Sequence, residues 1–337
     1  MNSSAGILSR LTTSNGINYI NIGLMIISLV AAYILPFEVF LFSYAFFGPL
    51  HYLTEISWLE KKSYFIKSKS DIWIFVLLVL GITVGMFNQQ SKFNSVVASF
   101  LFSGFIYALV ILYTQKIAVK LLFVVLAFMA SMIFSFNQYP NFPYLLFAIW
   151  LPTIIHVYFF TGGFILFGAL KGKSMSGIIS FIVFVLCAVV CFIYIPDNFG
   201  MAVTEYGKKA YAFFKFLNIS LYSAFGFGTM PPTDSTMLYY DFNALAIMRF
   251  IAFAYTYHYL NWFSKTTVIK WNEISKQRMT IILVLWILSV VLYAFSYKIG
   301  FYALFLLSML HVFFEFPLNH QTFIGIGKEL RARVKKS

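Results

Sequence analysis

Charged residues are scarce in this chain of 337 residues, making up only 10% of it against 61% that are hydrophobic. A soluble globular domain carries about 25% charged residues, so the composition excludes that class. Only two cysteines are present, Cys187 and Cys191. They fall one helical turn apart in a single apolar run, which excludes a disulfide framework and indicates packing residues. The first sixteen residues lack the apolar core and cleavage site of a signal peptide, so we expect the first apolar segment to be retained.

Long apolar runs fill the rest of the chain, and about 20 apolar residues are needed to cross roughly 30 Å of hydrocarbon. The sequence therefore predicts an all-α, polytopic membrane protein, with residues 1–337 forming a single bundle of about ten transmembrane helices. The expected helices lie near 17–35, 37–59, 72–88, 95–114, 117–136, 144–170, 177–195, 243–263, 279–297 and 299–316. Only Gln115 and Lys116 separate the fourth from the fifth.

Lysine and arginine cluster after every second expected helix, for example at Lys61 and Lys62 or at Lys171 and Lys173. The positive-inside rule then places both termini in the cytoplasm and makes 317–337 a basic cytoplasmic tail. We expect a bacterial inner (cytoplasmic) membrane. The net charge of +13 follows from this topology and from contact with anionic membrane lipids. No basic patch interleaved with aromatic residues indicates nucleic-acid binding.

One connection is long. Residues 196–242 form an expected extracytoplasmic loop, in which apolar residues recur at three- and four-residue spacing beside lysines, from Val203 to Leu217. This pattern is typical of an amphipathic helix at the membrane interface. The turn-rich sequence FGFGTMPPTDS follows it. Either a lid over an entrance or a loop anchored by aromatic residues would account for the segment.

Four of the five histidines lie inside expected membrane helices, where ionisable groups are costly and indicate a site. They are His51 in GPLHYLTEISWL, His156 in LPTIIHVYFFTG, His258 in YTYHYLNWF and His311 in SMLHVFFEFP, and a glutamate follows two of them, Glu55 and Glu315. The i, i+4 spacing puts each His and Glu on one helix face, about 5–6 Å apart at Cβ. Four imidazoles and two carboxylates are typical of a metal centre.

The expected topology also favours convergence of these histidines, because all four lie on helices that run inward. We counted residues from the cytoplasmic end of each expected helix and used a rise of about 1.5 Å per residue. His51, His258 and His311 then lie within roughly 3 Å of the same depth in the membrane. His156 lies deeper, but Pro152 and the glycines after it can kink or tilt its helix toward the others.

Imidazole and carboxylate ligands suit iron, with manganese, zinc and copper as alternatives. We expect one or two ions held by the four histidines, with Glu55 and Glu315 as catalytic carboxylates that ligate metal or accept from imidazole N–H groups. Four-helix di-iron proteins surround their metals similarly, but with Glu-x-x-His where this chain has His-x-x-x-Glu. The HxxxH and HxxHH boxes of membrane desaturases and alkane hydroxylases are absent.

The intramembrane set of four histidines resembles that of the bacterial membrane β-carotene dioxygenases, which are polytopic and hold iron with histidines from several helices. The paired HxxxH helix of that family is not present here. The resemblance concerns the type of chemistry. With the aromatic residues around the histidines, it favours a non-haem iron oxygenase, desaturase or hydroxylase acting on a fatty acyl lipid, an isoprenoid or a carotenoid. An electron donor is an expected further partner of such an enzyme.

Other interpretations of the same residues remain open. Opposed histidines also serve b-type haem, although two haems need histidine pairs at two depths. Histidines and glutamates can relay protons in a proton-coupled transporter, or a single histidine can be a helix-packing residue. Arg249 is expected to bind an anionic group of the substrate, to snorkel, or to pair with Asp241. His320, after Pro317, is expected to be exposed or to cap a helix.

Overall fold

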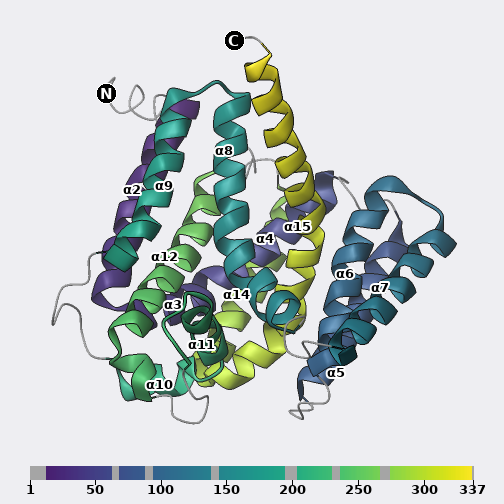
Figure 1. The fold of residues 1–337 in the computed structure, drawn as a ribbon, viewed down its shortest axis with the longest axis horizontal. Coiled ribbons are helices and arrows are strands. Elements are labelled where there is room, and N and C mark those ends of the chain that lie inside the picture. Colours follow the sequence, from purple (N-terminus) through teal and green to yellow (C-terminus); the bar gives the residue numbers. More distant parts are fainter. Residues whose placement is uncertain are drawn as a thin grey trace. The chain divides into compact units, whose positions relative to one another are not determined.

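The computed structural model describes residues 13–62, 68–87, 94–137, 144–193, 203–229, 236–265 and 274–335 (Figure 1). Within these ranges every regular element is a helix, which confirms the all-α prediction. The elements are α2 (Ser14–Ile34), α3 (Pro36–Phe42), η1 (Ser43–Phe47), α4 (Gly48–Lys62), α5 (Lys69–Phe87), α6 (Asn94–Tyr113), α7 (Ile117–Asn137), η3 (Tyr144–Phe160), α8 (Thr161–Lys171), α9 (Met175–Ile193), α10 (Glu205–Tyr211), α11 (Lys215–Ala224), η4 (Thr236–Tyr239), α12 (Phe242–Ser264), α14 (Lys276–Phe295) and α15 (Tyr297–Val334).

Seven helical segments in the described part of the chain are long and apolar enough to cross a membrane. They are α2, α6, the α7 segment Ile117–Phe134, η3 continued by α8, α9, α14 and α15. The chain is therefore an integral membrane protein. A helix also occupies each of the other ranges expected from the sequence, but α5 offers only the shorter apolar stretch Ser70–Gly85. The count of about ten spans stays a prediction.

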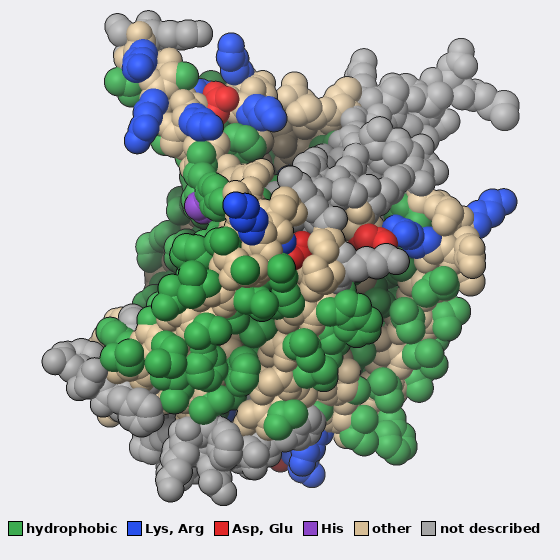
Figure 2. Space-filling view, turned by 90° about the vertical axis from the view of Figure 1, so that its right-hand side faces the viewer, with side chains coloured by type: hydrophobic (Ala, Val, Ile, Leu, Met, Phe, Trp, Pro, Cys, Tyr) green, Lys and Arg blue, Asp and Glu red, His purple; other side chains and the backbone are tan. Residues whose placement is uncertain are grey.

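The outward surface is apolar where lipid is expected. Hydrophobic side chains cover most of the face in Figure 2, and Lys and Arg side chains lie mainly above and below them. Helix α7 shows the pattern clearly, since its exposed side chains include Leu122, Phe123, Val125, Leu126, Met129 and Ile133. Lipid tails are as apolar as these side chains, so exposing such a surface to hydrocarbon costs no free energy of solvation.

Residues 1–51, 157–298 and 322–337 form one compact unit. Its central helix is α12, which packs against α2, α3 and α9. Alanines at positions 244, 246, 252 and 254 of α12 are fully buried, and such small residues let neighbouring helices approach closely. Polar contacts add specificity, because Tyr257 donates to Asn21 Oδ1 over 3.1 Å and the hydroxyls of Ser43 and Thr256 lie 2.8 Å apart.

Residues 52–156 and 299–321 form a second compact unit. In it α5, α6 and α7 lie side by side (Figure 1). The ring of Phe313 from α15 packs against Phe75 and Phe105 and fills the space beside Gly104, where a larger residue has no room. A buried polar cluster also joins these helices. Lys120 Nζ lies 2.7 Å from Asp71 Oδ1, and Tyr107 donates to the same oxygen.

Two boundaries differ from those expected. We expected the last helix to end near residue 316, but α15 continues through Pro317 to Val334, and Arg333 donates to the Leu170 carbonyl. Membrane helices tolerate an internal proline when neighbouring groups satisfy the backbone carbonyl that it leaves without a donor.

The amphipathic segment forms two helices, α10 and α11, rather than one. Parts of the expected loop, residues 196–202 and 230–235, lie outside the described ranges, as do Lys67 and Lys270 of the expected cytoplasmic connections.

Candidate metal centre

The residues singled out in the sequence lie on four helices. His51 and Glu55 are one turn apart on α4, His311 and Glu315 are one turn apart on α15, His156 is on η3 and His258 is on α12. All six side chains are buried, with at most 6% of each exposed. Burial of so many ionisable groups in membrane helices is costly unless they pair with one another or with an ion.

Four of the six meet inside the second unit. The Nε2 atoms of His156 and His311 lie 3.2 Å apart. On the other side of its ring, His156 Nδ1 lies 3.1 Å from Glu315 Oε2. The Glu55 carboxyl is close enough to that of Glu315 for the two to interact electrostatically. Two imidazoles and two carboxylates from α4, η3 and α15 are thus gathered in one place.

The remaining two histidines meet inside the first unit. The Nε2 atoms of His51 and His258 lie 3.1 Å apart, and their rings are steeply inclined. His258 Nδ1 lies 2.8 Å from the hydroxyl oxygen of Thr161, the first residue of α8. This pair has the same arrangement as His156 and His311, because in each pair one histidine has a polar side chain at Nδ1 while its Nε2 faces the Nε2 of the other.

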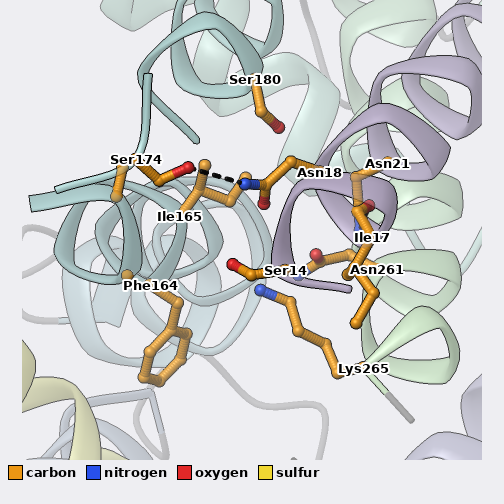
Figure 3. A pocket seen from close by; sticks show the side chains of 12 residues that line it. Ser14, Ile17, Asn18, Asn21, Phe164, Ile165, Ser174, Ser180, Asn261 and Lys265 are labelled. Carbon is orange, nitrogen blue, oxygen red and sulfur yellow. Dashed lines mark hydrogen bonds between the residues drawn. The ribbon is translucent and has the colours of Figure 1, made fainter. Parts of the chain in front are cut away.

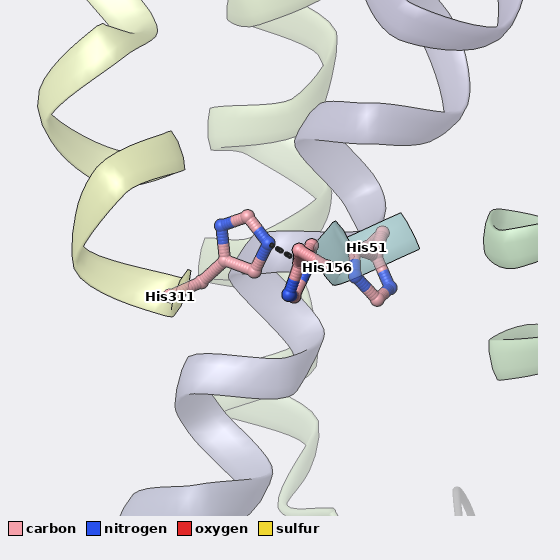
Figure 4. A group of neighbouring side chains, drawn as sticks. All are labelled: His51, His156 and His311. Carbon is pink, nitrogen blue, oxygen red and sulfur yellow. Dashed lines mark hydrogen bonds between the residues drawn. The ribbon is translucent and has the colours of Figure 1, made fainter. Parts of the chain in front are cut away.

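His51 and Glu55 both lie on helix α4, which is continuous between them. His51, which pairs with His258, is therefore one helical turn from Glu55, which interacts with Glu315. Figure 4 shows His51, His156 and His311 as a group of neighbouring side chains. One ligand atom from each of these three lies within 4.8 Å of the others. The sequence predicted His51, His258 and His311 at one depth, with His156 joining them through the Pro152 kink. The group of three includes His156, and His258 Nε2 lies against His51 Nε2.

The helix that carries His156 explains its position. The whole of η3 is wound as a π-helix, with Pro152 in its interior. A π-helix is wider than an α-helix, and proline removes one backbone hydrogen bond and clashes with the preceding turn. Both effects turn His156 relative to its place on a regular α-helix. The sequence identified Pro152 as the cause of a kink and did not identify the π winding.

Aromatic rings surround the histidines. The Tyr52 ring stacks on His311 with centroids 5.8 Å apart, and the Trp262 ring contacts the edge of His51 at 5.4 Å. Tyr259 also lies against both His51 and His258. Such rings exclude water and hold the imidazoles in fixed orientations, which strengthens any electrostatic interaction inside the site.

The geometry fits ligands of a metal ion. Metal–imidazole distances of about 2.0–2.1 Å put two nitrogens in adjacent positions of one coordination sphere roughly 3 Å apart, and nitrogens on opposite sides roughly 4 Å apart. The observed 3.1 and 3.2 Å match adjacent positions. Metal-bound histidines almost always direct their second nitrogen at a carboxylate, carbonyl or other polar group, as His156 and His258 do here. The histidine group can therefore bind a metal.

Arg249 lies elsewhere. It is nine residues before His258 on α12, which is about 13 Å along the helix axis. Its guanidinium is buried over the Tyr33 ring, 4.9 Å from the centroid. Asp241, its expected partner, caps the start of α12 by accepting from the Ala244 amide.

His320 is partly buried within α15, and its Nε2 lies 2.9 Å from the Tyr113 hydroxyl.

Sequence reasoning missed two polar residues beside the site. Thr161 follows His156 by five positions in the sequence and contacts His258 instead. Asn319 is buried on α15, one turn after Glu315. His311, Glu315 and Asn319 therefore follow one another at intervals of four residues on the same helix. The 311, 315, 319 pattern was visible in the sequence, but the expected helix end at 316 concealed it.

Comparisons with protein-family models, with curated proteins and with solved structures find no match to this chain.

Proposed function

We propose that this protein is a membrane-embedded, histidine-ligated non-haem metal enzyme, with iron as the metal, that oxidises a lipid-soluble substrate. The single observation that carries the proposal is the arrangement of His156. Its Nε2 faces His311 Nε2 at 3.2 Å while its Nδ1 lies 3.1 Å from Glu315. A carboxylate beside the second nitrogen is a common feature of metal-bound imidazoles. Imidazole and carboxylate donors together suit iron, and manganese, zinc or copper are the alternatives.

The proposed ligands are His51, His156, His258 and His311 around one or two ions. Bound iron would supply the activation of molecular oxygen. Glu315 fixes the His156 ring and can hold a proton at Nδ1, and Thr161 does the same for His258. Glu55, next to Glu315, is either a further ligand or a proton acceptor. Tyr52 and Trp262 keep water away from the ligands.

The substrate class follows from the surroundings. The site is built from membrane helices and lined by aromatic rings, so we propose a fatty acyl lipid, an isoprenoid or a carotenoid that enters from the bilayer. Arg249 is proposed to bind an anionic group of such a molecule. The proposed topology has about ten spans with both termini in the cytoplasm of a bacterial inner membrane, on the evidence of the lysine and arginine distribution.

The spacing of the histidine pairs favours this function over b-type haem. Two histidines that bind one haem iron occupy opposite sides of the porphyrin, roughly 4 Å apart with the ring between them. At 3.1 and 3.2 Å the two pairs are closer than that. A proton-coupled transporter would use the same carboxylates and imidazoles without a metal, so metal content separates the two functions.

The test is elemental analysis of the full chain, purified in detergent after expression with iron. We expect about one or two iron ions per chain, together with oxygen consumption when a lipid-soluble substrate is added. A Soret band would indicate haem instead. Protein that folds and transports a solute while it contains no metal would overturn the proposal in favour of a transporter.

A further inference from the structure

A second polar site lies in the first unit, apart from the histidines. It is a cavity of about 430 Å³ between α2, α8, α9 and the end of α12 (Figure 3). Twelve residues line it, and nine of these lie on the first turns of α2, along α8 or at the start of α9. Its volume is within the range of small-ligand pockets, which is about 300–1,000 Å³.

The walls of the cavity are polar and preformed. The Asn18 amide donates to Ser176 Oγ over 2.9 Å and to Ser174 Oγ over 3.3 Å. Nearby, Asn21 Oδ1 accepts from Tyr257 and Ser264, which holds its amide in place. These bonds engage the Asn18 amide, and the Asn21 amide donates to the Ile17 carbonyl. The Ser14 and Ser180 hydroxyls and the Asn261 amide also line the cavity and can donate to a ligand.

Lys265 gives the cavity its charge. It caps the end of α12, and Figure 3 shows its side chain extending into the pocket. Among the twelve lining residues it is the one ionisable group, so no carboxylate in the lining balances it. Burial lowers the pKa of its ammonium group. An anion in the cavity would reverse that effect, because an opposite charge nearby favours the protonated form.

Two helix ends add to the positive potential. The cavity is bordered by Ser14 at the start of α2 and by Ser174 just before α9, helices of 21 and 19 residues. The amino end of a helix carries a partial positive charge and attracts anions. Both ends and Lys265 therefore favour an anionic ligand.

We propose that this cavity binds a phosphate group, carried by the headgroup of an anionic phospholipid or by a soluble phosphoester. The tetrahedral oxygens of a phosphate can accept from the Lys265 ammonium, from the Ser14 and Ser180 hydroxyls and from the Asn261 amide. The apolar side chains of Ile17, Phe164 and Ile165 complete the wall and suit the glycerol and first methylene groups of a lipid. The site is independent of the proposed metal chemistry.

The chain offers two matched pairs of variants. Lys265→Gln removes the charge, and Lys276→Gln removes an exposed charge at the start of α14 as its control. Gly168 lines the cavity, and a Cβ added there meets nothing within 4 Å. The leucine side chain of Gly168→Leu can therefore occupy the cavity, and its Cβ does not collide with a neighbouring atom. Gly327→Leu is its control, because Gly327 has the same open surroundings on α15 and does not line the cavity.

The experiment uses the full chain in neutral phosphatidylcholine nanodiscs. Phosphatidylglycerol is titrated in one arm and inorganic phosphate in the other, with bound lipid counted by native mass spectrometry and the melting temperature recorded. We expect one saturable site. Lys265→Gln should weaken it by about tenfold to hundredfold, the worth of a charge-assisted hydrogen bond. Gly168→Leu should abolish it, and both controls should bind as the wild type does.

Binding of phosphatidylglycerol alone identifies a lipid headgroup, and competition by inorganic phosphate identifies a site open to soluble phosphoesters. Either result supports the proposal. The proposal is overturned if neither probe binds, or if binding survives both Lys265→Gln and Gly168→Leu. If Lys265→Gln does not fold, the Gly168→Leu arm decides, because it leaves the lysine in place.

Discussion

The Nε2 atoms of His156 and His311 face each other at 3.2 Å, although the two residues are 155 positions apart in the sequence. A buried imidazole ring needs partners for both of its nitrogens. His156 has the second partner in Glu315. A metal ion bound by the two imidazoles would serve as a partner for both Nε2 atoms at once.

Replacing His311 by alanine should remove the metal. The variant loses one ligand and leaves the Nε2 of His156 without its facing nitrogen. We expect metal content, measured by mass spectrometry of the purified protein, to fall from about one or two ions per chain to near zero. His320→Ala is the control on the same helix, since it removes the contact with Tyr113 and lies outside the histidine group. Equal metal content in the two variants would show that His311 is not a ligand.

Replacing Thr161 by valine tests the orientation of His258. Valine keeps the shape but cannot bond to Nδ1, which lies 2.8 Å from the threonine hydroxyl. Loss of such a partner typically lowers metal affinity by about 10–100-fold. Affinity is measured by competition with a chromophoric chelator. Thr83→Val serves as the control, because that hydroxyl donates to the Val79 carbonyl of its own helix. An unchanged affinity in Thr161→Val would remove Thr161 from the site.

Replacing Gly104 by alanine should destabilise the second unit. The new Cβ would collide with the Phe313 ring, and overpacking of this kind costs about 1–3 kcal/mol. The expected result is a lower melting temperature in detergent, followed by circular dichroism. Gly23→Ala has nothing within 4 Å of its Cβ and should be neutral or stabilising by about 0.5–1 kcal/mol. Equal melting temperatures would mean that Phe313 has room to move.

The buried pair of Asp71 and Lys120 gives a prediction about charge. Lys120→Met leaves the Asp71 carboxylate buried with only the Tyr107 hydroxyl as a donor among the contacts described above. Breaking a buried ion pair from one side costs about 3–5 kcal/mol. Adding Asp71→Asn to Lys120→Met removes the stranded charge and should recover most of the loss in an unfolding titration. A double variant less stable than the single one would contradict this account.

The positions of the helices were predictable because hydrophobic runs of about 20 residues have one stable conformation in a bilayer. The division between α6 and α7 at Gln115 was confirmed as well. The end of α15 was not predictable, because whether a helix continues through Pro317 depends on packing that is distant in the sequence, such as the contact of Arg333 with Leu170. Local propensity carries no information about that contact.

The burial of the candidate residues was predictable, and their pairing was not. The cost of burying ionisable groups drew attention to four histidines and two glutamates, all of which are buried, and their role as ligands stays a prediction. Depth counting assumed regular α-helices, so it could not foresee that a π-helix carries His156 or that His258 pairs with His51. The Thr161 contact needed the fold, since a threonine near a histidine in sequence is common.

X-ray absorption at the metal edge of the purified full chain tests the metal centre most directly. The account predicts iron bound by at least three imidazoles, with nitrogen atoms at about 2.0–2.2 Å and the outer-shell scattering of imidazole rings, and a loss of that signal in His311→Ala. Protein that is folded and active but contains no metal, or metal with a first shell that lacks imidazole, would contradict it.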